Sequence, residues 1–267
     1  MTYRKIWWTD FSAAEFSDLD PMKTIAIVPT AAVEQHGPHL PVGTDTIINQ
    51  GFLDHLVGRI PADIDVRILP VQAIGKSNEH IWSKGTVTHK AGNLIEAWTQ
   101  IGLEVARSGI KKIIFVNSHG GNVPINEIVA RELRVLRGMV AVKCAWGQFL
   151  SAKDAFSDIE NRYGIHGGDY ETSLVLHFRP ELVHLDKLAD FPSVAQRDEQ
   201  AYKYLRPTGA LSYAWIASDI NPAGVAGEAS RATAEKGRGV VEEAVEGFID
   251  LLREVERFPL PSAPTGD

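Results

Sequence analysis

The sequence predicts an α/β fold with a mainly parallel central sheet, and two observations support this prediction. Short apolar runs alternate along the chain with longer patterns typical of amphipathic helices. Alternation of this kind indicates βαβ units, in which a helix connects two parallel strands. The runs are also nearly continuous in apolar residues, as is expected for strands that helices cover on both faces.

The first βαβ unit is expected near the N-terminus. The run TIAIVPTAA, residues 24–32, is the first strand, and a helix is expected over residues 46–60. A second strand is expected over residues 66–71, because Pro61 and Gly75 bound an apolar run there.

The middle of the chain continues the alternation. A helix is expected over residues 93–107, and Gly109 ends it, because glycine readily takes the left-handed conformation just past a helix. The run IKKIIFV, residues 110–116, is expected to be a central strand. The apolar stripe of the helix consists of Leu94, Trp98, Ile101 and Val105.

The remaining elements are a helix over residues 124–137, a strand over 139–146, and helices over 170–178 and 231–253. The segment 185–229 is polar and rich in turn residues, so we expect an excursion rather than a second domain. The apolar face expected for the first of these helices consists of Ile125, Ile128, Val129 and Leu136.

Composition limits the class of protein. With 44% hydrophobic and 23% charged residues in 267, the chain is typical of a globular protein, and a single domain over residues 1–267 is predicted. A net charge of -7 disfavours a nucleic-acid partner. No segment reaches the ~18 apolar residues of a membrane span, and the N-terminus lacks a signal peptide, so a cytoplasmic location is expected. Cys144 is expected to be a buried, inert thiol, and the proline-rich tail after Phe258 to be loose.

The first chemical motif, VEQHGPHLPVGTD, follows the first strand. Glu34 and His36 are two residues apart, so in an extended chain they project to the same side, and a turn-rich loop carries Asp45 back toward them. Two carboxylates and an imidazole suit a divalent metal. In the alternative, Asp45 caps the next helix and His36 faces solvent, and local sequence leaves both open. His39 is expected to be structural or exposed.

The second motif, NSHGGN, follows the central strand. Here His119 precedes two glycines, Gly120 and Gly121, whose backbone can approach a ligand closely. Alternatively the segment is only a turn, or Ser118 is a nucleophile. The last reading is disfavoured because Val116 stands where a nucleophile elbow needs glycine.

The third motif, HGGDYETS, contains His166 and Glu171. This pair could supply a further ligand and a proton donor. In the alternative, Asp169 caps the helix and Glu171 only complements its dipole. Elsewhere, Ser77 could reach a substrate, whereas other histidines carry less weight: His80 and His89 lack local partners that single them out, His177 is expected in the core, and His55 and His184 on the surface.

Taken together, EQHGPHLPVGTD, NSHGGN and HGGDYETS resemble the creatininase family, and the segment GVAGEASRATAEKG is also similar to that family. The resemblance runs from about residue 5 to residue 255. It implies a three-layer α/β sandwich, two divalent metal ions per chain (zinc with manganese or iron) and a homohexamer. It also implies that Glu34, Asp45 and His119 hold one ion. The second ion would be held by His36 and Asp45, which bridges both, with Glu171.

Two departures from creatininase affect the substrate. Creatininase has a ligating glutamate at the position of Gly121, and a tryptophan that stacks on substrate at the position of Arg162. Creatinine itself is therefore in doubt, and cyclic amides, N-formyl compounds and peptide-derived precursors remain open. Arg162 is the residue to examine for substrate binding.

We expect a metal-dependent amidohydrolase acting on a small-molecule amide. A hydroxide bridging two metal ions would attack the carbonyl carbon, and His166 would protonate the leaving nitrogen. Backbone N–H groups of Gly120 and Gly121 would stabilise the oxyanion. The alternatives are a metal-free serine hydrolase using Ser118 and an inactive ligand-binding member of the fold.

Overall fold

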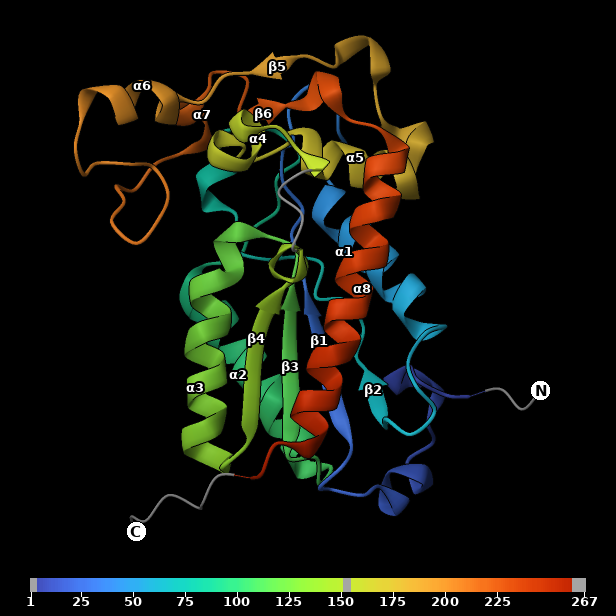
Figure 1. Ribbon diagram of the computed structural model, residues 1–267. Helices are drawn as coiled ribbons and strands as arrows, with labels where there is room; N and C mark the ends of the chain where they lie inside the picture. Colours follow the sequence, from blue (N-terminus) through green and yellow to red (C-terminus); the bar gives the residue numbers. More distant parts are fainter. Residues whose placement is uncertain (1–3, 151–154, 261–267) are drawn as a thin grey trace.

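The computed structural model describes residues 4–150 and 155–260 (Figure 1). A sheet of four strands in the order β2-β1-β3-β4 lies at its centre, and each neighbouring pair is parallel. The strands are β1 (Ile25–Thr30), β2 (Val66–Ile68), β3 (Lys112–Asn117) and β4 (Val140–Ala145). All four expected strands are present, and the predicted mainly parallel sheet is confirmed.

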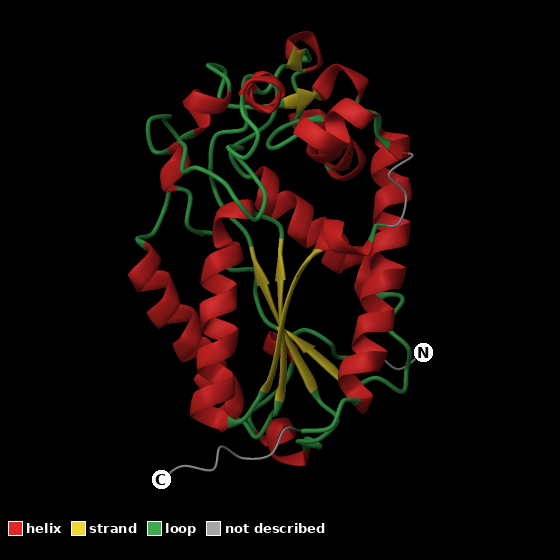
Figure 2. Ribbon diagram, turned by 60° about the vertical axis from the view of Figure 1, so that its left-hand side comes forward, coloured by secondary structure: helices red, strands yellow, loops and turns green. Residues whose placement is uncertain are grey.

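Helices cover both faces of the sheet, so the body has three layers (Figure 2). Two of them pack together on one face and three cover the other. The first pair is α2 (Ala91–Arg107) and α3 (Val123–Arg137). The second group is α1 (Thr44–Val57), α5 (Asp169–Phe178) and α8 (Ala234–Arg257). The three-layer sandwich is therefore confirmed.

The two faces of the central strands enter two separate cores, because side chains alternate along a strand. In β1, Ile25 and Ile27 belong to the core under α1 and α8, whereas Ala26 and Val28 belong to the core under α2 and α3. All four are fully buried. This double coverage explains why the strand is a continuous apolar run in the sequence.

The buried face of α3 differs from the expected one. Ile125 and Val129 are buried as expected, but Ile128 and Leu136 are 42% and 47% exposed. Leu133 completes the buried stripe, because it follows Val129 by four residues and so lies on the same side of the helix. The prediction for Ile128 and Leu136 was wrong, since apolar residues in one helix need not share one face.

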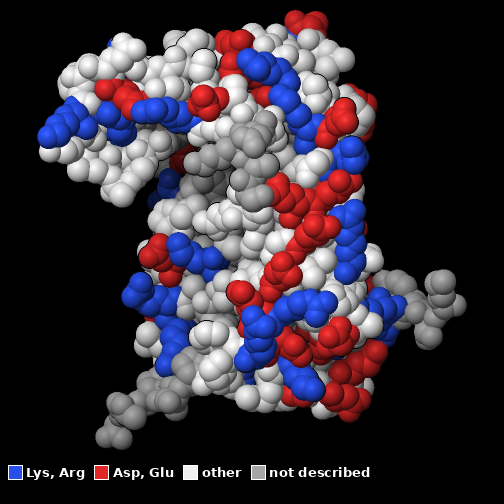
Figure 3. Space-filling model, viewed as in Figure 1, with Lys and Arg blue, Asp and Glu red and all other residues white. Residues whose placement is uncertain are grey.

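Residues 185–229 form the expected excursion, which lies beyond the carboxyl ends of the strands (Figure 1). It contains α6 (Val194–Ala201) and α7 (Ala217–Ile220). Its ends are joined by the antiparallel pair of β5 (Asp190–Phe191) and β6 (Gly227–Glu228). Part of it overhangs the body and leaves a hollow beneath it, on a face where acidic and basic side chains are interspersed (Figure 3).

Three smaller expectations concern the rest of the chain. Burial of the thiol raises the pKa of Cys144 to about 12, as expected for an inert cysteine, although the residue is half-buried rather than fully buried. Among the described residues, no helix combines the length and the apolar character needed to cross a membrane. Most of the tail after Phe258 lies outside the described residues.

Candidate metal centre

The five residues predicted as metal ligands converge at the carboxyl rim of the sheet. Glu34 and His36 lie in the loop after β1, and Asp45 is in the first turn of α1. His119 follows β3 by two residues, and Glu171 is in the first turn of α5. The register of β1 with β3 pairs Thr30 with Asn117, so both loops leave the sheet at the same level.

The first group of side chains contains Glu34, Asp45 and His119. The Nδ1 atom of His119 lies 3.1 Å from Glu34 Oε1 and 3.4 Å from Asp45 Oδ2. All three residues are buried. One ligand atom from each lies within 4.8 Å of the other two, a separation that one metal ion can span.

The second group contains His36, Asp45 and Glu171. The Nε2 atom of His36 lies 3.5 Å from Asp45 Oδ1 and 3.7 Å from Glu171 Oε2. These three residues also offer ligand atoms within 4.8 Å of one another. Asp45 therefore contributes one carboxylate oxygen to each group and lies between the two.

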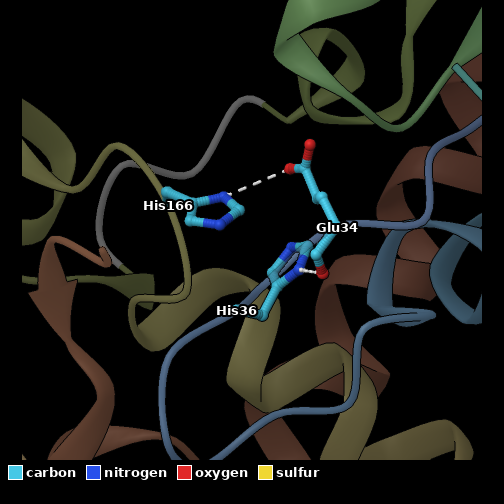
Figure 4. A group of neighbouring side chains, drawn as sticks. All are labelled: Glu34, His36 and His166. Atoms are coloured by element: carbon cyan, nitrogen blue, oxygen red, sulfur yellow. Dashed lines mark hydrogen bonds and ion pairs between the residues drawn. The ribbon is translucent and has the colours of Figure 1, made fainter. Parts of the chain in front are cut away.

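Backbone carbonyls orient the two imidazoles of these groups. The Nδ1 atom of His36 lies 3.1 Å from the carbonyl oxygen of Glu34, and the Nε2 atom of His119 lies 2.8 Å from the carbonyl oxygen of Lys76. In each ring that nitrogen donates its proton to the carbonyl, so the other nitrogen faces the carboxylates. Figure 4 shows the contact of His36 with the Glu34 carbonyl. A neutral ring would place a lone pair against negative oxygens unless a cation lay between them.

Several buried polar atoms of the cluster support a cation there. Among the described residues, both carboxylate oxygens of Glu34, His36 Nε2 and Asp45 Oδ2 have no hydrogen-bond partner. Leaving buried charges unpaired is strongly unfavourable. Two ligands about 2.1 Å from one ion lie roughly 3–3.5 Å apart, close to the separations of 3.1 to 3.7 Å seen here. The donor set therefore fits two divalent ions.

The pKa shifts of the two rings have the same origin. Burial favours the neutral ring of His36, but the Asp45 carboxylate outweighs burial and raises the pKa to about 9. Burial likewise opposes the charge on His119, while Glu34 and Asp45 raise its pKa to about 10. Without metal, protons would occupy the inward nitrogens at neutral pH, so metal binding must displace them.

His166 lies beside this cluster with its ring turned toward it. Its Nε2 atom lies 2.7 Å from the carbonyl oxygen of Gln35, and its Nδ1 atom lies 3.6 Å from Glu34 Oε1 (Figure 4). Burial, followed by the neighbouring His36, lowers the pKa of His166. The neutral ring thus presents an accepting nitrogen to the cluster, so it must take up a proton before it can donate one.

The predicted substrate-binding residues have different surroundings. Ser77 is fully buried and its Oγ lies 3.3 Å from His119 Nε2. A Cβ atom at Gly121 would clash with the Lys76 carbonyl and the Glu79 carboxylate, whereas one at Gly120 would meet no atom within 4 Å. Only Gly121 therefore has to be glycine on packing grounds.

Arg162 lies on α4 (Asp158–Tyr163), and its guanidinium forms an ion pair with Glu199 of α6. The Arg162 side chain is 63% exposed. The contact joins α4 to the excursion. His39, by contrast, is fully buried, with Nε2 2.9 Å from the Gly167 carbonyl oxygen, so it is a structural histidine.

Sequence reasoning missed Glu79 and His80. His80 is 2% exposed, its Nε2 atom lies 3.5 Å from Glu34 Oε1, and its ring centre lies 4.4 Å from that of His166. Burial, followed by His166, lowers the pKa of His80 to about 3. Glu79 Oε1 lies 3.6 Å from His119 Nε2. The signal in the sequence was an adjacent acid and histidine in a loop before a helix.

Several alternative readings do not match the structure. His36 is 1% exposed rather than solvent-facing, and the N-cap of α1 is Gly43 rather than Asp45. Asp169 is not the N-cap of α5 but accepts bonds from Ser173 and Lys236. The alternative in which Asp169 caps α5 is therefore excluded, because the ion pair with Lys236 of α8 holds its carboxylate.

The serine alternative also lacks support. Among the described residues, the Oγ of Ser118 bonds the carbonyl oxygens of Asp45 and Thr30 and the side-chain amide of Asn49. None of these groups is a base that could activate a serine hydroxyl.

A cavity of about 620 Å³ lies on the outer side of α1 and α5, and none of the five ligand candidates lines it. His55 and His177 line it, with ring centres 5.4 Å apart. The expectation that His177 lies in the core was wrong, since it is only partly buried at this cavity.

Comparisons with known proteins agree with this geometry. A family model described as creatinine amidohydrolase matches residues 9–252. The chain is 32% identical to the mycofactocin precursor peptide peptidase of Mycolicibacterium smegmatis, over 88% of this chain and 87% of that one. It is 26% identical to the creatinine amidohydrolase of Pseudomonas putida, over 88% and 90%. Solved creatininases in manganese and Zn-Zn forms superpose with a TM-score of 0.75 at 22% identity, covering 96% of this chain and all of theirs.

Proposed function

The chain belongs to the creatininase family, without being creatininase itself, and on this premise we propose that it is a dinuclear-metal amidohydrolase. It would cleave the C–N bond of a small cyclic amide or N-formyl compound. One observation carries the proposal. Two groups of buried ligand atoms share Asp45, and their inward nitrogens and carboxylate oxygens need cations between them.

Each group would hold one divalent ion. Glu34, Asp45 and His119 would hold the first, and His36, Asp45 and Glu171 the second, with Asp45 bridging. Zinc with manganese or iron suits imidazole and carboxylate ligands. When bound, the two ions supply an activated water molecule and a Lewis acid for the carbonyl oxygen.

The surrounding residues would move protons and bind substrate. The inward Nδ1 of His166 would accept a proton from the attacking water and return it to the leaving nitrogen. Glu171 would orient the second ion and His166, since its Oε2 lies 4.0 Å from His166 Nδ1. Backbone N–H groups at Gly120 and Gly121 would stabilise the oxyanion. The Ser77 hydroxyl would help to orient His119 through its outward nitrogen, Nε2.

The proposed substrate class rests on the side chain that lies beside Gly121 at the rim of the sheet. The Glu79 carboxylate fills the space beside Gly121, so this chain presents an acid from another loop near the place where creatininase has its own. We therefore propose a substrate other than creatinine. The name of the mycobacterial relative refers to a precursor peptide, which makes a peptide amide the second substrate to test.

The test combines metal analysis with a substrate screen. Protein loaded with zinc, manganese or iron would be assayed on small cyclic amides, N-formyl amides and short peptides. We expect about two ions per chain and turnover that a chelator abolishes. A serine-directed phosphonate should leave the activity intact. Fewer than one ion per chain, or inactivation by the phosphonate, would contradict the proposal.

Three further properties are proposed with the function. The whole chain, residues 1–267, is one domain, because α8 near the C-terminus packs on the same sheet as α1. A cytoplasmic location and a homohexamer are proposed from the composition and from the family.

A further inference from the structure

Four imidazoles surround Glu34, and three of them share one arrangement. His36, His119 and His166 each place their outward nitrogen within 3.1 Å of a backbone carbonyl oxygen. A carbonyl only accepts hydrogen bonds, so the outward nitrogen carries the proton. When these rings are neutral, as metal ligation or proton acceptance requires, their inward nitrogens therefore carry lone pairs.

His80 is the exception, because its outward nitrogen meets a donor. Its Nδ1 atom lies 2.8 Å from Nε2 of the Gln35 side chain. The orientation of that amide is set by two backbone groups. Gln35 Oε1 accepts from the N–H of Gly37 at 2.9 Å, and Gln35 Nε2 donates to the carbonyl oxygen of Gly224.

The second N–H of the Gln35 amide is then directed at His80 Nδ1, which must be unprotonated to accept it. A neutral imidazole has one proton, so the proton of His80 is on Nε2, the atom that faces Glu34. Ligation of a metal through Nε2 would need the other tautomer, with the proton on Nδ1. The ring of His80 points an N–H into the cluster where the others point lone pairs.

Among the described residues, that proton has no hydrogen-bond acceptor at normal distance. The separation of 3.5 Å between His80 Nε2 and Glu34 Oε1 exceeds the usual 2.7–3.2 Å of an N–H···O bond. His80 is only 2% exposed, its ring centre lies 4.4 Å from that of His166, and its Nδ1 contacts the Gln35 amide. The donor is therefore held in place before any ligand arrives.

We propose that His80 is a catalytic hydrogen-bond donor, oriented by Gln35, whose Nε2–H binds the carbonyl oxygen of the substrate as that oxygen becomes negative. This inference rests on the proposed amide hydrolysis. A neutral donor suits the position, because an imidazolium would be repelled by two divalent ions. Fixed donors aimed at a developing oxyanion are effective because they need no reorganisation during the reaction.

The test compares three variants with wild type. His80→Ala removes the donor, and His80→Gln retains a side-chain N–H. Gln35→Glu keeps the shape but places an acceptor against His80 Nδ1, which moves the ring proton to that atom. His89→Ala is the matched control, because His89 is an exposed histidine of the same loop region.

We expect all four variants to keep the wild-type metal content. His80→Ala and Gln35→Glu should lower kcat by ~10²–10³-fold with little change in KM, as for loss of one oxyanion donor. His80→Gln should recover part of that loss. Loss of an ion in His80→Ala would identify His80 as a ligand, and a kcat within threefold of wild type would exclude the donor role; either result overturns the inference.

A second readout does not depend on turnover. In zinc-loaded protein labelled with ¹⁵N-histidine, long-range ¹H–¹⁵N spectra distinguish the two tautomers, and the signals missing from His80→Ala identify His80. We expect the Nε2–H form in wild type and its loss in Gln35→Glu. An Nδ1–H form in wild type would refute the inference while leaving the proposed function intact. Fully loaded wild type that hydrolyses no amide would refute the proposed function, and the donor role with it.

Discussion

The strands of the sheet and the rim at their carboxyl ends are equally buried but chemically opposite. Ile25 and Ile27 are fully buried, and so is Glu34, with His36 and Asp45 each only 1% exposed. Burial stabilises the strands because it removes apolar surface from water. The same burial penalises the rim, where charged groups lose their hydration. Apolar neighbours are therefore enough to stabilise the strands, whereas the charged side chains at the rim need cations or protons to balance their charge.

Removing the shared carboxylate should have the largest effect. We expect Asp45→Ala to lose both ions and to lower kcat/KM by more than ~10³-fold, since loss of one oxyanion donor alone costs ~10²–10³-fold. Elemental analysis and amide hydrolysis rates would measure both. Full occupancy of both sites in this variant would show that Asp45 does not bridge the two ions. It would also contradict the view that the buried charges at the rim depend on bound cations.

Removing His166 should separate proton transfer from metal binding. We expect His166→Ala to keep both ions and to lose ~10²–10⁴-fold in kcat on amides with poor leaving groups. The loss should be smaller for an activated ester, whose leaving group needs no proton. A rate loss that is equal for both substrates would argue against a role in protonating the leaving group. His89→Ala again serves as the control.

Truncating a core side chain should affect stability instead. Phe248 of α8 is fully buried in the core beneath α1 and α8. We expect Phe248→Ala to lower the free energy of unfolding by ~3–5 kcal/mol, as for other buried aromatic residues. Urea unfolding measures this. The folded fraction should keep the metal content of wild type, and selective loss of metal would show that core and rim are coupled.

The smallest effect should be a pH dependence confined to the metal-free protein. The pKa values of His36 and His119 are raised to about 9 and about 10 in the fold. Their protonation therefore stabilises the fold fully below the unfolded value of ~6.5, and this contribution is lost as the pH rises through 9 to 10. Urea midpoints at pH 6, 8 and 10 should fall without metal and stay nearly level with zinc. Equal slopes would contradict the proposed exchange of protons for ions.

Local pattern predicted much of the fold and part of the site. The continuous apolar runs of β1 and β3 follow from their coverage on both faces. Shorter or interrupted apolar runs predicted β2 and β4, and β4 is only partly buried. Glu34 and His36 could be paired from their spacing of two. In contrast, Ile128 and Leu136 were assigned to the wrong face of α3, since only neighbours in space decide which apolar residues are covered.

The loop residues show where sequence reasoning stopped. Glu79 pairs with Lys76 close by in the chain. The partners that place His80 and Glu79 at the cluster are Glu34 and His119, which lie 46 and 40 residues away in opposite directions. The role inferred for His80 depends on the orientation of one amide, which Gly37 and Gly224 set together. No hydrophobic periodicity or local motif in the sequence indicates such a contact.

Composition and spacing by themselves predicted that this chain forms an α/β sheet, and they indicated which loops carry candidate metal ligands. Only the tertiary structure decided that Asp45 lies between two ligand groups and that the outward nitrogen of His80, unlike those of the other three histidines, meets a donor. The physical reason is that strands and helices follow from contacts within a few residues. The rim depends on strand register, with Thr30 beside Asn117, which brings residues 89 apart along the chain, Thr30 and His119, to one edge.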